Sequence, residues 1–161
     1  MDTMITKMVC DIRLLLGYWL LASIVLVSSV ASASAADNEG ASPNDIVVVV
    51  SRQNPLQSLT KEQLESIFLG RTQQFPTGQR AVPVDQVEGS TVRERFYIEI
   101  LDRTSAQVRS YWSRILFTGR GHPPRSVASS EEVLRILATD AQAIGYIERR
   151  FVNDAVTVVL E

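Results

Sequence analysis

The feature that most constrains the fold is a run of five β-branched residues from Ile46 to Val50. β-Branched side chains favour extended strands. Because the run is uninterrupted rather than alternating with polar residues, it predicts a strand that is covered on both faces, as in a sheet sandwiched between helices. The rest of the chain should therefore contain helices for two layers.

Three hydroxyl residues mark helix starts. Thr60-x-x-Gln63 and Thr104-x-x-Gln107 fit capping boxes, and Ser129-x-x-Glu132 has the same spacing. A further amphipathic helix is expected over Thr91–Leu101. The apolar faces of these helices should contain Leu64, Ile67 and Phe68; Phe96, Ile100 and Leu101; Val108, Tyr111, Trp112, Ile115 and Leu116; and Val133, Leu134, Ile136 and Leu137.

Short apolar segments lie between these helices. Ala81–Val84, Ala143–Ile147 and Ala155–Leu160 predict strands, whereas Thr118–Arg125, rich in Gly, Arg and Pro, predicts a loop. This loop either closes over an anion, contacts a partner, or simply connects two elements at the surface. Strands that alternate with helices indicate the α/β fold class.

The N-terminal segment predicts export. An apolar run from Leu14 to Val30 precedes the small residues 31–36, the arrangement of a cleaved secretory signal. We expect a signal peptide at residues 1–35, a flexible lead at 36–45, a folded domain at 46–161 and a periplasmic location. The alternative is an inner-membrane anchor formed by residues 14–30, which approach the roughly 20 residues needed to span a bilayer.

The composition excludes several kinds of chemistry. The only cysteine, Cys10, precedes the apolar run, so the predicted mature chain has neither a disulfide nor a thiol nucleophile. His122 is the only histidine and cannot form a metal site alone. No serine lies in a G-x-S-x-G pattern. The net charge of −2 does not favour nucleic acid as a partner. We therefore predict no enzymatic activity, no cofactor and no metal.

The segment Glu88-Gly89-Ser90-Thr91 joins the strand that begins at Ala81 to the helix at Thr91. Such a corner leaves backbone N–H groups unpaired at the positive end of a helix dipole, where an oxyanion can bind. The alternative is purely structural: Ser90 or Thr91 caps the helix, and Thr91-x-x-Glu94 completes a capping box. The sequence pattern leaves both interpretations open.

Four motifs occur in one order and spacing. The first runs from Leu59-Thr60 to Arg71 and contains Ser66-Ile67-Phe68-Leu69-Gly70. The other three are Val82-Pro83-Val84, Glu88-Gly89-Ser90 and Ala143-Ile144-Gly145-Tyr146. From about Ile46 to Val152, the series resembles the phosphate-binding periplasmic proteins of ABC transporters, which are type II periplasmic binding proteins. The resemblance implies a single lobe with a central mixed sheet flanked by helices. Full-length members are roughly twice as long and close two lobes around phosphate.

The resemblance also implies site residues. The family's loop, of the type Arg-Ser-Asp-Gly-Ser-Gly-Thr, aligns with Gly89 and Ser90 at its Gly-Ser pair, and Thr91 replaces the second glycine. Gln86 stands at the arginine position and cannot supply the charge. Arg93, one turn into the helix, or Arg120 in the neighbouring loop could replace it. The anion-binding residues implied are Gly89, Ser90, Thr91, Arg93 and Arg120.

The function implied by the resemblance is that of a periplasmic solute-binding protein for phosphate or a similar small oxyanion, linked to phosphate ABC transport. Its partners would be the anion and a transporter permease or another periplasmic protein. A separate alternative is a homodimer that rebuilds a two-lobed cleft. The alternative is a sensory or protein-interaction domain, not involved in transport, that keeps the lobe fold without tight ligand binding.

Overall fold

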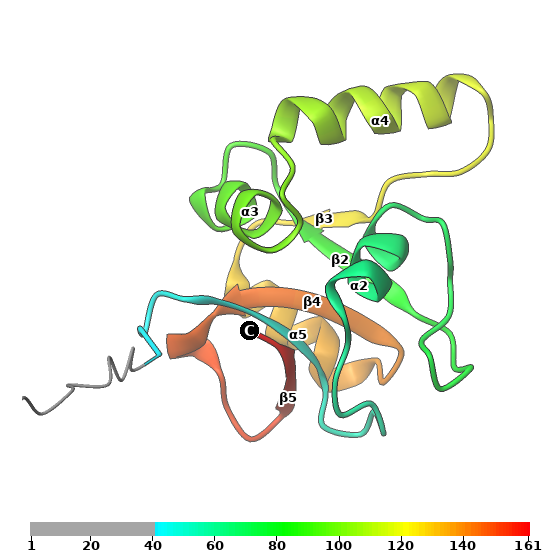
Figure 1. Ribbon diagram of the computed structural model, residues 1–161. Helices are drawn as coiled ribbons and strands as arrows, with labels where there is room; N and C mark the ends of the chain where they lie inside the picture. The colour runs from blue at the N-terminus through cyan, green and yellow to red at the C-terminus, as the bar shows by residue number, and fades with distance from the viewer. Residues whose placement is uncertain (1–40) are drawn as a thin grey trace, which may run out of the picture. The chain divides into compact units, whose positions relative to one another are not determined.

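The computed structural model describes residues 41–161, in which helices lie on both sides of a five-stranded sheet (Figure 1). The predicted signal peptide, its alternative as a membrane anchor, and most of the predicted lead lie outside the described residues. Along residues 41–161, no helix has the length and apolarity to cross a membrane. The elements are β1 (Ile46–Ser51), α2 (Lys61–Phe68), β2 (Val82–Gln86), α3 (Thr91–Arg95), the π-helix η1 (Phe96–Ile100), α4 (Ser105–Phe117), β3 (Arg125–Val127), α5 (Ser130–Thr139), β4 (Ala143–Glu148), the 3₁₀ helix η2 (Arg149–Phe151) and β5 (Val156–Leu160).

The sheet is mixed, with strand order β3-β2-β4-β1-β5. β2 runs parallel to β3 and β4, whereas β1 is antiparallel to β4 and β5. This arrangement confirms the predicted α/β class with a central mixed sheet. The carboxyl ends of β2 and β3 point to the same edge, where the connections to α3 and α5 begin.

β1 is buried on both faces, as its uninterrupted apolar run predicts. Val48 and Val50 belong to a core cluster that also holds residues of α2, η1 and α4. Val47 and Val49 point into a second cluster, where α5 covers the other face of the sheet. The alternation of neighbouring side chains between the two clusters explains why none of the five residues is polar.

The predicted helix caps at Thr60, Thr104 and Ser129 are present, and each hydroxyl accepts a hydrogen bond from the backbone N–H three residues later. The first two form complete capping boxes. At the third, the Glu132 carboxylate accepts from the N–H of Ala128, one residue before the cap. These local patterns start α2, α4 and α5 where the sequence predicts.

The helix predicted over Thr91–Leu101 differs in two respects. Ser90, not Thr91, is the N-cap residue, so the predicted Thr91-x-x-Glu94 capping box is wrong. The helix also widens into π geometry at Phe96–Ile100 without a break in the chain. Phe96, Ile100 and Leu101 are buried as predicted.

The predicted Thr118–Arg125 loop ends one residue early, because Arg125 begins β3. Val84 of β2 pairs with Arg125, and Gln86 pairs with Val127. A strand of three residues with only its last side chain buried carries little local signal. Its extended structure depends on pairing with β2.

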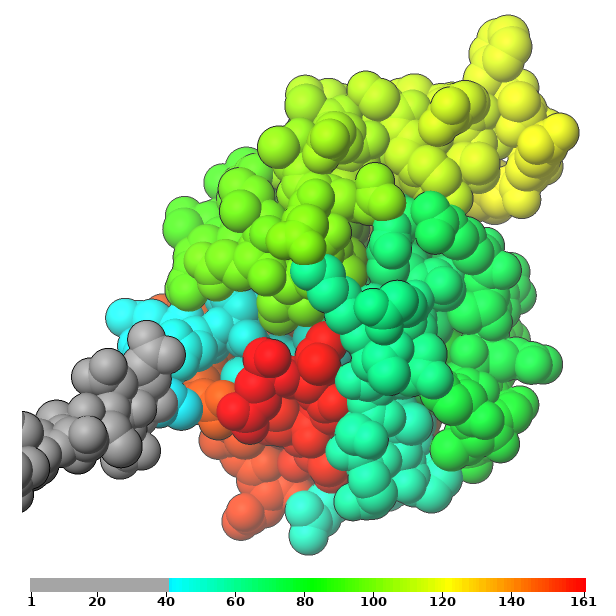
Figure 2. Space-filling model, viewed as in Figure 1, coloured from blue at the N-terminus to red at the C-terminus, as the bar shows by residue number. Residues whose placement is uncertain are grey.

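Two surface features are plain in the space-filling view (Figure 2). The chain near residue 60 lies beside β5, in agreement with the hydrogen bond from the N–H of Leu59 to the carbonyl of Val159. The C-terminal end of α4 and the loop after it, in yellow, project from the rest of the domain.

Pro43 and Asp45, at the described end of the predicted lead, accept hydrogen bonds from the N–H groups of Arg150 and Arg149.

Candidate functional site

The connection from β2 to α3, residues 87–92, is called here the β2–α3 corner. Gly89 adopts φ 86°, a left-handed conformation that glycine accepts without strain. The N–H of Ser90 donates to the carbonyl of Val87 at 3.2 Å and closes the turn. The N–H groups of Thr91 and Val92 have no acceptor among residues 41–161, as expected for the first turn of a helix.

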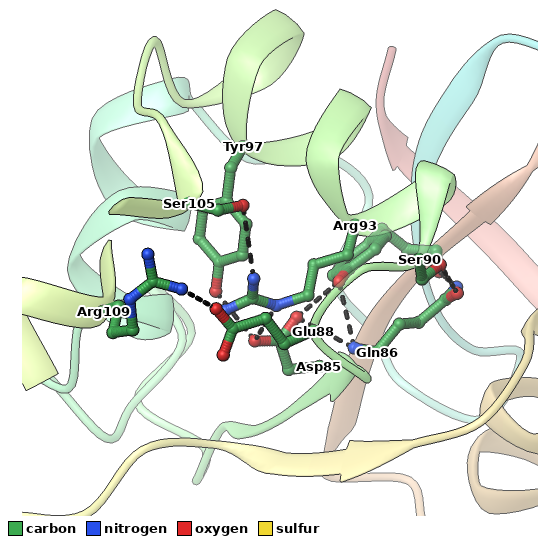
Figure 3. Close-up of polar contacts among 9 residues, drawn as sticks. Asp85, Gln86, Glu88, Ser90, Arg93, Tyr97, Ser105 and Arg109 are labelled. Carbon is green, nitrogen blue, oxygen red and sulfur yellow. Dashed lines mark hydrogen bonds and ion pairs between the residues drawn. The ribbon is translucent and has the colours of Figure 1, made fainter. Parts of the chain in front are cut away.

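The Ser90 hydroxyl does not cap the helix, because it donates to Oε1 of Gln86 at 3.2 Å (Figure 3). Nε2 of the buried Gln86 donates in turn to the Ser130 hydroxyl at 3.3 Å and to the Tyr146 carbonyl at 3.2 Å. Gln86 thus joins β2 to α5 and β4 and is part of the structural framework. A charged side chain at this buried position would need a counter-ion.

Beneath the corner, Arg93 forms an ion pair with Asp85 at 3.2 Å between Nε and Oδ2 (Figure 3). Arg93 is only 8% exposed, and its guanidinium lies over the ring of Tyr97. Asp85 also accepts hydrogen bonds from the hydroxyls of Tyr97 and Tyr146 and from the N–H of Gln86. Both carboxylate oxygens are therefore occupied, which is what a buried carboxylate requires.

The pKa values reflect this packing. Burial and the neighbouring charge of Asp85 raise the pKa of the Tyr97 and Tyr146 hydroxyls far above the ordinary tyrosine value. Burial opposes the charged form of Arg93, whereas the charge and the hydrogen bond of Asp85 favour it, and the net result of the surroundings is a raised pKa of Arg93. In the folded state the two phenols therefore stay neutral beside the Arg93–Asp85 ion pair.

A pocket of about 250 Å³ opens over this cluster, between the corner, α4 and the chain that leads into β3. Asp85 and Arg93 form one part of its wall, and Glu88 and Arg109, which are ion-paired to each other, form another. Two carboxylates balance two guanidiniums, so the pocket has little net attraction for an anion. Within residues 41–161, no three His, Asp or Glu side chains are placed to hold a metal ion.

The structure brings four of the five expected residues together. Gly89, Ser90 and Thr91 form the corner, and Arg93 lies beneath it. Arg120 lies in the exposed loop after α4 and does not line the pocket. Sequence reasoning missed the partners of Arg93, although an aspartate in a buried strand was a signal, because it requires a partner. These partners are Asp85, Tyr97 and Ser105.

Comparison of the sequence with protein-family models and with curated proteins gives no match. Three solved structures are similar over 71% of this chain. The first, from Clostridium perfringens and described as a phosphate ABC transporter substrate-binding protein with bound phosphate, shows 23% identity and a TM-score of 0.55 over 43% of its length. An ABC-type phosphate transport receptor from Vibrio cholerae shows 20% identity and a TM-score of 0.56 over 44% of its length. PstS from Borrelia burgdorferi shows 14% identity and a TM-score of 0.53 over 46% of its length.

These likenesses establish the fold. Residues 41–161 have the α/β architecture of a lobe of a phosphate ABC transporter substrate-binding protein. The chain matches less than half the length of each of the three proteins. The first two are described as a substrate-binding protein and a transport receptor.

Proposed function

We propose that this chain is a periplasmic solute-binding protein that binds phosphate or a similar small oxyanion at the β2–α3 corner, as a component linked to phosphate ABC transport. The observation that carries the proposal is the likeness of the fold, over 71% of the chain, to three proteins of phosphate transport, one of them with bound phosphate. A permease or another periplasmic protein would then be its partner.

The corner would contact the anion through its backbone. α3 continues directly into η1, so the N–H groups of Thr91 and Val92 lie at the positive end of a helical segment that runs to Ile100. Gly89 leaves the approach to these groups open, because nothing lies within 4 Å of the position where a Cβ would stand. The Ser90 hydroxyl would exchange its bond to Gln86 for one to the anion.

Weak binding is expected under this proposal. Asp85 neutralises Arg93, and a single lobe encloses less of a ligand than a closed cleft. Arg120 would contribute only a long-range electrostatic attraction for the anion, because its loop lies outside the pocket. We expect a dissociation constant on the order of 0.1 mM for phosphate.

One backbone donor can be removed at little structural cost. Proline is favoured at the first position of a helix, and the extended conformation of Ser90 (φ −68°, ψ 130°) suits a residue that precedes proline. Thr91→Pro therefore deletes the N–H and keeps the helix, whereas the matched control Thr91→Ala retains it. Calorimetry should show a loss of phosphate affinity of about tenfold or more for Thr91→Pro alone, since a hydrogen bond to a charged group contributes about 1.5–3 kcal/mol.

Equal phosphate affinity in the Thr91→Pro and Thr91→Ala variants would place the anion elsewhere. An absence of heat with phosphate and sulfate in the unmodified protein would reject anion binding at the corner altogether.

A second candidate function, a protein-interaction domain, is favoured by one observation. Phe117, the last residue of α4, is 94% exposed, and its neighbour Leu116 is 47% exposed. Exposed apolar residues at one place often mark a contact with another protein. A second copy of the chain is the simplest partner to test. Sedimentation velocity over a range of concentrations should then show self-association that Phe117→Ser removes, whereas a monomer at every concentration would reject this partner.

A further inference from the structure

A second pocket of about 230 Å³ lies at the amino end of β2 and shares Trp112, Pro123 and Pro124 with the pocket over the Arg93–Asp85 cluster. Its wall is formed by the turn after α2, by Val82 and Pro83 at the start of β2, by Trp112 of α4 and by the chain that enters β3. We call it the basic pocket, because Arg80, His122 and Arg125 line it and no Asp or Glu does.

The arginine side chains of the basic pocket form no ion pairs within the described domain. Neither Arg80 nor Arg125 has a carboxylate within ion-pair distance among residues 41–161. A single unpaired arginine on a surface is ordinary. Two of them and a histidine around one cavity without an acidic residue form an environment that attracts anions.

The same pocket has a flat apolar wall. Trp112 is only 7% exposed, and Pro83 and Pro124 also line the cavity. The indole Nε1 of Trp112 is buried and has no acceptor among the described residues. An apolar cavity of about 150 Å³ can hold benzene. The basic pocket thus has room for a ring of that size and an anionic group.

We propose that the basic pocket binds a small organic anion, in which one carboxylate or phosphate group is attached to a flat or apolar body. The guanidiniums of Arg80 and Arg125 hold the anionic group, and the body lies against Trp112. Arg80 and Arg125 are far apart in sequence, and both line this pocket because Arg125 begins β3 and pairs with Val84 of β2. The inference is independent of phosphate binding at the corner, because the residues that hold the anion differ.

Phenyl phosphate and benzoate are suitable probes, because they share one ring and differ in the anionic group. Benzyl alcohol supplies a ring without charge, and inorganic phosphate supplies charge without a ring. Calorimetry on the full chain should detect phenyl phosphate, benzoate or both, and the tighter of the two identifies the preferred anionic group. Benzyl alcohol and inorganic phosphate should bind this pocket at least tenfold more weakly.

Two double variants decide the location. Arg80→Ala/Arg125→Ala should weaken binding of the preferred probe about a hundredfold, at roughly tenfold for each charged hydrogen-bond donor. The matched control Arg52→Ala/Arg135→Ala changes the net charge equally at exposed positions outside the pocket and should leave the affinity unchanged. Quenching of tryptophan fluorescence should accompany binding and disappear in Trp112→Phe.

Two results would overturn the inference: no saturable heat from either probe up to about 10 mM, or equal affinities in the two double variants. The binding proposals for the two sites can be rejected independently of each other. Thr91→Pro should leave phenyl phosphate binding intact, and the Arg80/Arg125 variant should leave the binding of inorganic phosphate at the corner intact.

Discussion

The β2–α3 corner and the basic pocket lie at opposite ends of β2 and use their arginines differently. At the corner, Arg93 is buried and matched by Asp85, two tyrosine hydroxyls complete the cluster, and the arginine holds the fold together. In the basic pocket, Arg80 and Arg125 are exposed and face no carboxylate within the described domain. An arginine beside a predicted anion-binding corner can thus be structural, while arginines outside any sequence motif can lack a charged partner.

The largest expected effect is a difference between the two regions in how much an arginine-to-alanine substitution lowers the free energy of unfolding. Arg93→Ala should lower the free energy of unfolding by about 3–5 kcal/mol, because it leaves the buried Asp85 carboxylate without its counter-ion. Arg80→Ala should change it by less than about 0.5 kcal/mol, as is usual for an exposed side chain without partners. Urea denaturation of the two variants measures the difference. A loss below about 1 kcal/mol in Arg93→Ala would mean that its guanidinium is free for a ligand.

The next effect is a dependence of stability on alkaline pH. The pKa values of Tyr97 and Tyr146 in the folded state lie above the value of about 10 in the unfolded chain. Above pH 10 only the unfolded chain releases these protons. The contribution of the two tyrosines to the free energy of unfolding is therefore fully present below pH 10 and is lost as the pH rises. Each tyrosine should cost about 1.4 kcal/mol of stability between pH 8 and pH 11, and the two together about 3 kcal/mol.

Urea midpoints across this pH range provide the measurement. Tyr97→Phe should remove half of the pH-dependent loss, whereas Arg80→Ala should retain all of it. A Tyr97→Phe protein with the same pH dependence as the unmodified chain would show that the phenol is not held neutral by Asp85.

The third effect acts on the wall of the basic pocket. Gly70 adopts φ 65°, and a Cβ there would lie 2.9 Å from Cη2 of Trp112. Gly70→Ala should therefore cost about 2 kcal/mol from backbone strain and overpacking combined. Gly78→Ala, at φ 83° with no atom within 4 Å, should cost about 1 kcal/mol from strain alone.

Displacement of the Trp112 indole should also change ligand binding, which can be measured. Gly70→Ala should weaken the binding of phenyl phosphate and leave the corner's affinity for inorganic phosphate unchanged. Equal losses at both sites would show that Trp112 couples the two regions, which would then no longer be independent.

Local patterns predicted most of the fold. The hydroxyl and its partner three residues later determine the caps at Thr60 and Thr104, so the sequence shows these helix starts directly. At Ser90 the same reasoning failed, because Gln86, held by Ser130 and by the Tyr146 carbonyl, draws the hydroxyl away from the helix. That competition depends on α5 and β4, which are distant in sequence.

The candidate sites were less predictable than the fold. The glycine and serine of the corner follow a recognisable pattern, but the pairing of Arg93 with Asp85 requires knowing which face of β2 lies under α3. The basic pocket has no motif, since Arg80 and Arg125 line one cavity only because the short strand β3 pairs in parallel with β2. Such constellations follow from topology and not from spacing.

The smallest expected effect concerns Arg120, the one expected site residue that lies apart from the corner. Its backbone N–H donates to the carbonyl of Ile115, and its side chain has no hydrogen-bond partner among residues 41–161. Arg120→Ala should lower phosphate affinity by about twofold at low salt and by less at 0.15 M, because salt screens the attraction between an exposed charge and an anion. Arg52→Ala is the matched control for the loss of one exposed charge. A tenfold loss that persists at high salt would require the loop to close over the corner and bring Arg120 to the anion. The corner would then have a free cation of its own, and the contrast with the basic pocket would no longer hold.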